Sequence, residues 1–317
     1  MANTRRVESR LAHKIITRNC VFFVYYVTNV IAKNEKITTK DRIFNFLEVL
    51  LQCIKYQGFL IAVQVGYHYI ICRFFSNFIS SKTYRFFNFH IYFLDNNSIA
   101  HMLLELFGLN LYYFKSETDS PVIIDVGANI GDSIIYFKWL YPNAKIYAFE
   151  PLAVAYNMLE KNVKINNFKN VFAYNVALGN TEKTIQLFSD TKGTSRLSTI
   201  NKSASKQNLK KDAKFQQIII KKLSGYKKIM ALKKVDLLKI DIEGAEGAVF
   251  DDLQSVLIKT EKVIVEYHMV PDVRDNSFDK IISVLKKFKF KPTFTGLYRN
   301  TDNEGNPIAF LIVATRH

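Results

Sequence analysis

Short apolar runs alternate with amphipathic segments from Pro121 to the end of the chain, and this rhythm constrains the fold more than any other feature. Apolar runs of about four to eight residues predict buried strands, and apolar residues at every third or fourth position predict helices. Strands that alternate with helices form βαβ units. We therefore predict a doubly wound α/β fold with a mostly parallel sheet. The expected strands are 122–126, 145–149, 171–178, 184–188, 217–221, 235–240, 263–267 and 308–314, and the expected long helices are 133–141, 152–166, 245–257 and 277–288.

The composition is that of a globular protein with one strongly basic segment. The chain has 317 residues and is 49% hydrophobic, which excludes a disordered protein. The formal net charge is +16, and residues 201–234 carry 11 lysines against a single acid, Asp212. Such a patch fits an anionic partner, such as nucleic acid, a membrane surface or an acidic glycan. A solvated loop is the simpler interpretation.

The cysteines and the apolar runs bear on where the protein resides. Cys20, Cys53 and Cys72 contain no CxxC pair and are odd in number, which favours a reducing compartment and a cytoplasmic protein. The longest uncharged run, 56–72, falls short of the ~20 apolar residues of a membrane span. Basic residues precede the apolar run 19–32 as in a signal peptide, but no small-residue cleavage site follows it cleanly.

Aromatic residues concentrate in the first part of the chain. Residues 1–120 hold 23 of the 44 aromatic residues, and their three- and four-residue spacing up to about residue 80 predicts helices with broad apolar faces. We expect a helical extension over residues 1–80 and an α/β domain over 81–317. The extension could cap the α/β domain, or it could lie on a membrane or form an oligomer interface. The sequence leaves these alternatives and the oligomeric state open.

The first chemical motif is a glycine-rich turn. Residues 125–132 (Asp-Val-Gly-Ala-Asn-Ile-Gly-Asp) leave an apolar strand and open a helix. Gly127 and Gly131 permit a tight turn and a close approach of the backbone to a ligand. The segment lacks the third glycine of a dinucleotide fingerprint and the Lys-Ser/Thr of a phosphate loop. We therefore do not expect a pyrophosphate at this turn.

The second motif is an acid at the end of the next strand. Glu150 stands 19 residues after Gly131, and Pro151 follows it at a position where a helix tolerates a missing N–H. An acid in this place can accept hydrogen bonds from both hydroxyls of a ribose. A glycine turn with a ribose-binding acid, and without phosphate-binding features, predicts an S-adenosylmethionine site.

Acids and a histidine occupy two further strand ends. Residues 239–246 read Lys-Ile-Asp-Ile-Glu-Gly-Ala-Glu, and Glu266 and His268 close the strand predicted at 263–267. The carboxyl ends of strands in such a sheet face the ligand crevice. An acid at a helix N-terminus can instead interact with the helix dipole, which suits Glu246 well and Asp241 poorly.

These motifs resemble the FkbM family of S-adenosylmethionine-dependent methyltransferases, from about Ser98 to the C-terminus. The resemblance implies a class I methyltransferase (Rossmann-like) fold, whose seven-stranded sheet ends in a reversed hairpin. It also implies O-methylation, commonly of sugar hydroxyls in glycans or natural products. One departure is Leu223-Ser224, where the family often has Leu-Asp. The expected cofactor-binding residues are Asp125, Gly127, Asn129, Gly131, Asp132, Ser133, Glu150 and Pro151.

His268 is our first candidate for the base that takes the proton of an acceptor hydroxyl, since the ordinary pKa of histidine is near neutrality. Asp241 is the second candidate. The remaining acids of the two strand ends could orient the base or hold substrate hydroxyls: Glu243, Glu246 and Glu266. The same carboxylates with His268 could instead bind a divalent cation. Because no dedicated metal-ligand spacing is present, we predict no metal.

The expected acceptor is a small molecule or a glycan. Nucleic acid is less favoured, because no Asn/Asp-Pro-Pro-aromatic motif follows the strand before Asp241 and no nucleic-acid-binding domain is recognisable. Two alternatives stay open: an RNA methyltransferase that uses the lysine-rich segment 201–234, and a non-catalytic binding module on the same fold. Retention of the cofactor motifs argues against the second. Peripheral membrane contact through the N-terminal helices is a further expectation.

Overall fold

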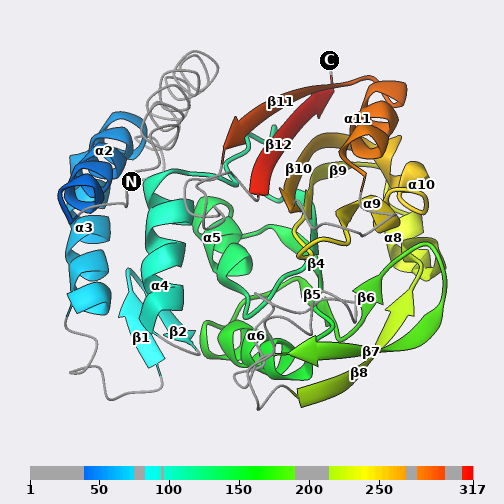
Figure 1. Cartoon of the computed structure of the whole chain (residues 1–317), viewed down its shortest axis with the longest axis horizontal. Coiled ribbons are helices and arrows are strands. Elements are labelled where there is room, and N and C mark those ends of the chain that lie inside the picture. The colour runs from blue at the N-terminus through cyan, green and yellow to red at the C-terminus, as the bar shows by residue number, and fades with distance from the viewer. Residues whose placement is uncertain are drawn as a thin grey trace. The chain divides into compact units, whose positions relative to one another are not determined.

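The computed structural model describes residues 39–74, 83–93, 96–189, 214–268, 277–296 and 309–316 (Figure 1). The chain divides into two compact units, and the first boundary between them lies between Lys115 and Ser116. Residues 1–38, with Cys20, and most of the expected loop 189–214 lie outside the described residues. We call the first unit the helical unit and the second the α/β unit.

The helical unit is built on two helices, α2 (Thr39–Gln57) and α3 (Phe59–Phe74), which are separated by Gly58 at a φ of 96°. The hairpin of β1 (Thr83–Phe86) and β2 (Phe89–Tyr92) follows, and then α4 (Asn96–Met102) and a π-helical turn at Leu103–Gly108. Phe86 of the hairpin packs against His68 of α3 and against Phe107 of the π-helical turn, at ring distances of 5.1 and 4.8 Å. These contacts explain why the boundary lies at Lys115 and not at residue 80, where we had expected it. The expectation that the N-terminal helices cap the α/β domain concerns contacts between the two units, and it stays a prediction.

A seven-stranded sheet forms the centre of the α/β unit. Its strand order is β11-β12-β10-β9-β3-β4-β5. The strands β3, β4, β5, β9 and β10 pair in parallel, and β12 runs antiparallel to β10. This order confirms the predicted class I methyltransferase fold with a reversed last hairpin. The bounds are β3 Val122–Val126, β4 Lys145–Phe149, β5 Val171–Tyr174, β9 Val235–Ile240, β10 Thr260–His268, β11 Phe290–Gly296 and β12 Ala309–Arg316.

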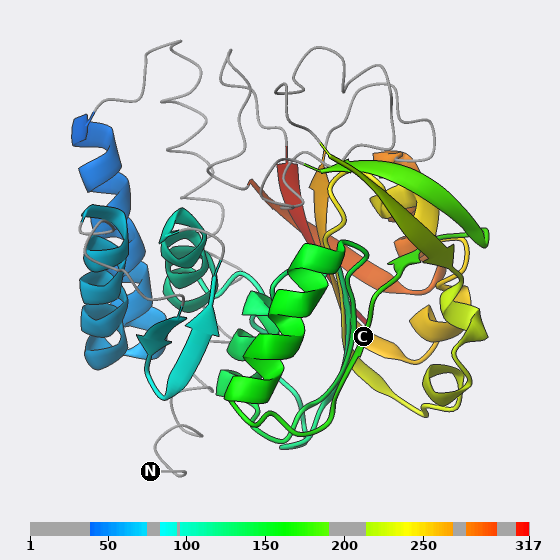
Figure 2. The same ribbon diagram turned by 90° about the horizontal axis from the view of Figure 1, so that it is seen from below.

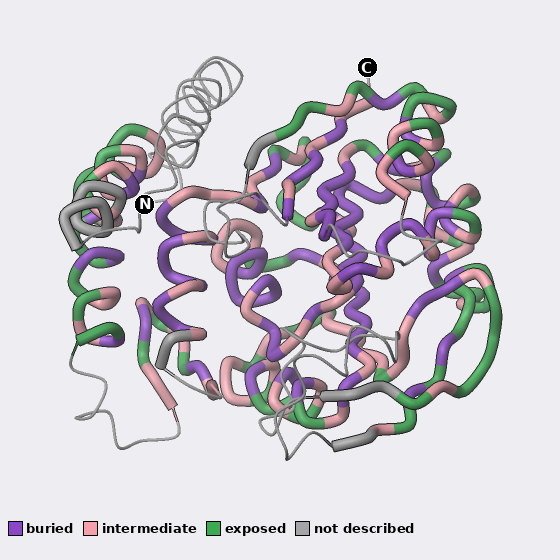
Figure 3. The backbone as a smooth tube through the Cα atoms, in the orientation of Figure 1, coloured by how far each residue is buried: buried purple, intermediate pink, exposed green. Residues whose placement is uncertain are grey.

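Helices cover both faces of this sheet. Figure 2 shows α5 (Asp132–Leu140) and α6 (Ala153–Ile165) on one face, and α10 (Gln254–Leu257) and α11 (Phe278–Lys287) on the other. Ser277 caps α11, because its side chain accepts a hydrogen bond from the backbone N–H of Lys280 at 3.3 Å. The strand β9 is buried along its whole length, and β3 and β4 are buried at every residue but the first, as the purple centre of Figure 3 shows. Burial on both faces is the reason that these strands read as continuous apolar runs.

A second sheet of three strands flanks the first, with the order β6-β8-β7. Its strands are β6 (Ala177–Leu178), β7 (Lys183–Ser189) and β8 (Lys214–Lys221). The expected strand 171–178 is therefore two strands in different sheets. The expected helix 245–257 is two short helices, α9 (Glu246–Val249) and α10. A 3-10 turn (Leu223–Gly225) and α8 (Lys227–Met230) connect β8 to β9.

Candidate active site

The glycine turn after β3 crosses the end of the neighbouring strand β9. Gly127 and Gly131 have φ angles of 83° and 90°, which glycine adopts without strain. A Cβ atom on Gly127 would lie 1.7 Å from the backbone oxygen of Asp241. The backbone after β9 thus requires a glycine at this position, and the close approach of Gly127 to a ligand stays a prediction.

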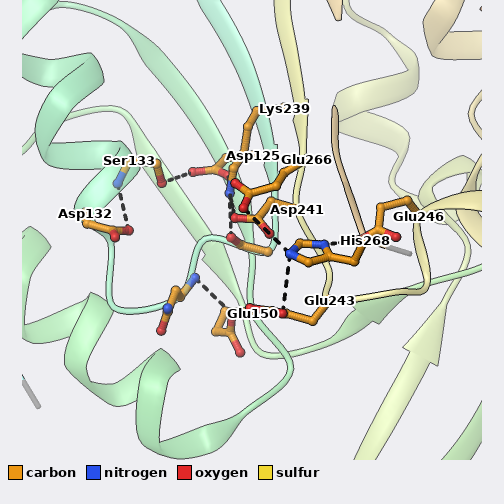
Figure 4. A network of polar contacts seen from close by, with 12 residues as sticks. Asp125, Asp132, Ser133, Glu150, Lys239, Asp241, Glu243, Glu246, Glu266 and His268 are labelled. Atoms are coloured by element: carbon orange, nitrogen blue, oxygen red, sulfur yellow. Dashed lines mark hydrogen bonds and ion pairs between the residues drawn. The ribbon is translucent and has the colours of Figure 1, made fainter. Parts of the chain in front are cut away.

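Glu150 lies at the end of β4 and faces the glycine turn (Figure 4). Its side chain is buried, and its two oxygens accept hydrogen bonds from the backbone N–H groups of Asn129 at 2.9 Å and Leu152 at 2.8 Å. Burial raises the pKa of Glu150 to about 7, although these two hydrogen bonds oppose the shift. Asn175 holds the segment from the other side, since its amide donates to the carbonyl oxygens of Glu150 and Pro151.

Lys239, in β9, connects the glycine turn to the acids around it. Its ammonium group donates to the backbone oxygen of Gly127 at 2.7 Å and pairs with Asp125 at 3.2 Å and Asp241 at 3.4 Å. The other oxygen of Asp125 accepts a hydrogen bond from the Ser133 hydroxyl at 2.5 Å. Burial lowers the pKa of Lys239, but the surrounding aspartates outweigh it and raise the pKa above its ordinary value. Lys239 is therefore a buried cation that holds the turn together.

Our list of expected site residues omitted Lys239, although the motif contains it. The signal that could have found it is a lysine inside an otherwise apolar strand, because a buried lysine requires a carboxylate partner. Asp132, at the start of α5, is half-buried, and burial raises its pKa to about 6 against the opposing charge of Lys239.

His268, the last residue of β10, is buried among carboxylates. Its Nδ1 lies 2.9 Å from Glu246, and its Nε2 lies 3.5 Å from Glu243 and 3.6 Å from Glu266. Burial alone would lower the pKa of His268. The hydrogen bond to Glu246 and the charges of Glu243 and Asp241 outweigh burial and raise the pKa to about 10. The pKa of His268 therefore lies above the ordinary histidine value from which we had chosen it as the base.

Glu246 is the buried carboxylate that orients this histidine. It lies in the first turn of α9, where it also accepts a hydrogen bond from the backbone N–H of Gly244 at 2.9 Å. The helix-dipole interpretation of Glu246 does not include its contact with His268.

The structure brings together the four residues that we had expected to act in catalysis: Asp241, Glu243, Glu266 and His268.

The same residues have the donor atoms of a cation site. One ligand atom each from Asp241, Glu243 and His268 lies within 4.8 Å of the others. A divalent cation could occupy such a spacing if His268 were neutral. A protonated His268 instead supplies a single positive charge to the carboxylates around it. The sequence prediction of no metal stays a prediction.

Comparisons with known proteins identify what the α/β unit is similar to. The sequence model of the Methyltransferase FkbM domain matches residues 125–292. Methyltransferase 1 of Beauveria bassiana (strain ARSEF 2860) is 29% identical over 178 residues, which cover 51% of this chain and 70% of the relative. Methyltransferase sdnD of Sordaria araneosa is 33% identical over 165 residues, which cover 45% of this chain and 64% of the relative.

Among solved structures, the crystal structure of methyltransferase FkbM from Methylobacillus flagellatus KT aligns with a TM-score of 0.41 at 9% identity. That alignment covers 82% of this chain and 62% of the solved one.

Within the residues that the structure describes, every helix is too short or too polar to cross a membrane.

Proposed function

Because this chain belongs to the FkbM methyltransferase domain family, we propose that it is an S-adenosylmethionine-dependent O-methyltransferase acting on a hydroxyl of a sugar, a glycan or a related metabolite. The observation that carries the proposal is the meeting of His268 and three carboxylates at the strand ends that border the glycine turn. Such a cluster can take a proton from a hydroxyl and hold neighbouring hydroxyls by hydrogen bonds.

The residues around Glu150 fit the nucleoside part of this cofactor. Each oxygen of Glu150 accepts one backbone N–H and keeps acceptor capacity for a ribose hydroxyl. Beside it, the side-chain oxygen of Asn129 is buried and has no hydrogen-bond partner among the described residues. A buried acceptor of this kind is expected to meet a donor from a bound group. When bound, S-adenosylmethionine supplies an electrophilic methyl group on a positively charged sulfonium.

Lys239 and Glu246 prepare the residues that act on the acceptor. Lys239 holds Gly127 and Asp241 in place and balances the charge of the aspartates. Glu246 fixes the ring of His268 by its hydrogen bond to Nδ1, so that Nε2 is directed toward Glu243 and Glu266. A carboxylate that fixes the ring orientation of a catalytic histidine is a recurrent arrangement.

His268 must lose its proton before it can act as the base. Its raised pKa favours the imidazolium form at neutral pH. The sulfonium of a bound S-adenosylmethionine would add a second positive charge near the acidic cluster. It would lower the pKa of His268, because like charges disfavour the charged form. His268 would then take the proton of the acceptor hydroxyl at Nε2, and the bound cofactor would supply the methyl group to the hydroxyl oxygen. Asp241, which is partly exposed in the same cluster, is the second candidate for this role.

Transfer of labelled methyl from S-adenosylmethionine into glycan, lipid, protein and RNA fractions tests the proposal. We expect label in the glycan or small-molecule fraction, whereas label confined to RNA would overturn the acceptor class. His268→Ala should bind cofactor normally and lose about 10²–10⁴ in turnover. His90→Ala, at an exposed position in β2, is the matched control. Activity that survives in His268→Ala and disappears on exhaustive chelation would assign the role to a metal.

A further inference from the structure

The α2–α3 pair of the helical unit exposes a large hydrophobic surface. In α3, Leu60 is 77% exposed and Phe74 is 72% exposed. Monomeric soluble proteins seldom expose a contiguous apolar patch of more than a few hundred Å². The exposed hydrophobic residues of α3 are Phe59, Leu60, Val63, Tyr67, Ile70 and Phe74, and those of α2 are Leu47, Leu51 and Ile54. We call these nine side chains the apolar face.

The spacing of these residues makes one continuous stripe on each helix. At about 100° per residue, the six exposed residues of α3 fall within an arc of about 100°, and the three of α2 within about 60°. The buried residues of α3, among them Val65 and Cys72, lie outside that arc. Since α3 has 16 residues, its stripe extends for about 24 Å. Among the described residues of the helical unit, one side of these helices thus packs into the interior and the other side is exposed.

We propose that the apolar face rests on the surface of an anionic membrane. Two exposed cations border it: Lys55 lies about 40° beyond Leu51 on α2, and Arg73 lies about 40° beyond Phe59 on α3. No acidic residue occurs in α3. The sequence before α2 adds five basic residues against one acid, Glu8, within residues 1–18. Hydrophobic residues bordered by cations are the composition with which interfacial helices bind anionic lipid.

The charge distribution favours lipid over a second copy of the chain. An interface between two copies in a symmetric dimer uses the same patch twice. The cations that border the apolar face would then enter the interface from both copies. α3 has no acid to pair with them, and the acid beside Lys55 on α2, Glu48, is half-buried. Anionic headgroups neutralise these same cations. Because the described helices are too short or too polar to span a bilayer, the face would lie on the membrane surface.

Sedimentation of the full chain with vesicles tests the proposal. We compare vesicles of phosphatidylcholine alone with vesicles that contain about 30% phosphatidylserine. The double variant Leu60→Glu/Phe74→Glu changes the apolar face, and Val63→Gln/Tyr67→Gln is a milder second pair at exposed positions. Ile258→Glu is the matched control, because Ile258 is 62% exposed and lies in the α/β unit. Circular dichroism checks that each variant is folded.

We expect the wild-type chain to bind the anionic vesicles more strongly than the neutral ones, and to leave them as the salt concentration rises. Both face variants should bind at least about tenfold more weakly, and the control should bind as the wild type does. Absence of vesicle binding by the wild type would overturn the proposal, as would unchanged binding by both face variants. Light scattering that shows a wild-type dimer, and monomeric face variants that still bind vesicles, would assign the face to a second copy.

Discussion

Replacement of Gly127 by alanine should damage the fold far more than the same replacement at Gly131. Both glycines have φ angles near 90°, in the region where an alanine is strained by roughly 1–2 kcal/mol or more. The two positions differ in the space around the new Cβ atom. At Gly131 the nearest atom is Cγ of Leu159 at 3.4 Å, which is ordinary contact. At Gly127 it is the backbone oxygen of Asp241 at 1.7 Å.

The larger effect at Gly127 follows from what would have to move. Relief of the contact requires the ends of β3 and β9 to separate. That movement stretches the 2.9 Å hydrogen bond from Asp241 N–H to the carbonyl of Val126 and the 2.7 Å bond from Lys239 to the carbonyl of Gly127. We expect Gly127→Ala to lower the free energy of unfolding by at least about 4 kcal/mol, in the range that only severe defects reach. For a domain of this size, 1 kcal/mol corresponds to about 2–4 °C in melting temperature.

Thermal denaturation followed by circular dichroism measures both variants. Gly131→Ala should melt about 2–8 °C below the wild type, and Gly127→Ala at least about 8 °C below it or without a folded state. Melting temperatures of the two variants within about 2 °C of each other would refute the reasoning, because they would show that backbone strain alone decides the effect. Calorimetry with S-adenosylmethionine adds a second readout, in which Gly131→Ala should retain the better affinity.

Three other changes test the polar network. Glu150→Ala should weaken S-adenosylmethionine binding at least about tenfold, while Glu160→Ala, an exposed acid on α6, should not change it. Because the pKa of Glu150 is raised to about 7, its carboxylate becomes protonated as the pH falls from 8 to 6, so wild-type affinity should fall about tenfold over that range. The affinity of Glu150→Gln should fall no more than about twofold, which is the effect of half-protonating Asp132 at its pKa of about 6. Lys239→Met should lower the free energy of unfolding by about 3–5 kcal/mol, since it leaves Asp125 buried without its cation. Adding Asp125→Asn should recover part of that loss, and thermal denaturation measures both variants. Glu246→Gln should lower turnover at least about tenfold with an unchanged dissociation constant for the cofactor, measured by rate assays and calorimetry, because it acts only through the orientation and charge of His268.

The strands that position the site could be predicted because burial leaves a strong pattern in the sequence. The runs 122–126, 145–149 and 235–240 coincide with β3, β4 and β9, all of which are buried strands in the middle of the sheet. Elements at the edge leave a weaker pattern. The strand β11 is absent from the sequence prediction, and its residues Lys291, Thr293 and Phe294 are exposed. The helix expected at 245–257 contains Asp251 and Asp252, where the structure has a turn between α9 and α10.

The location of His268 could be inferred from its sequence, whereas its charge state could not. Its place at the end of an apolar strand is enough to direct it to the carboxyl edge of a parallel sheet. Its pKa depends on acids that arrive from a different strand end and from a short helix, at distances that only the folded chain defines. The same holds for Lys239, whose partners come from β3 and from the residue after β9. The sequence motifs therefore predict which groups meet in this site. The protonation states of these groups depend on distances that only the folded structure provides.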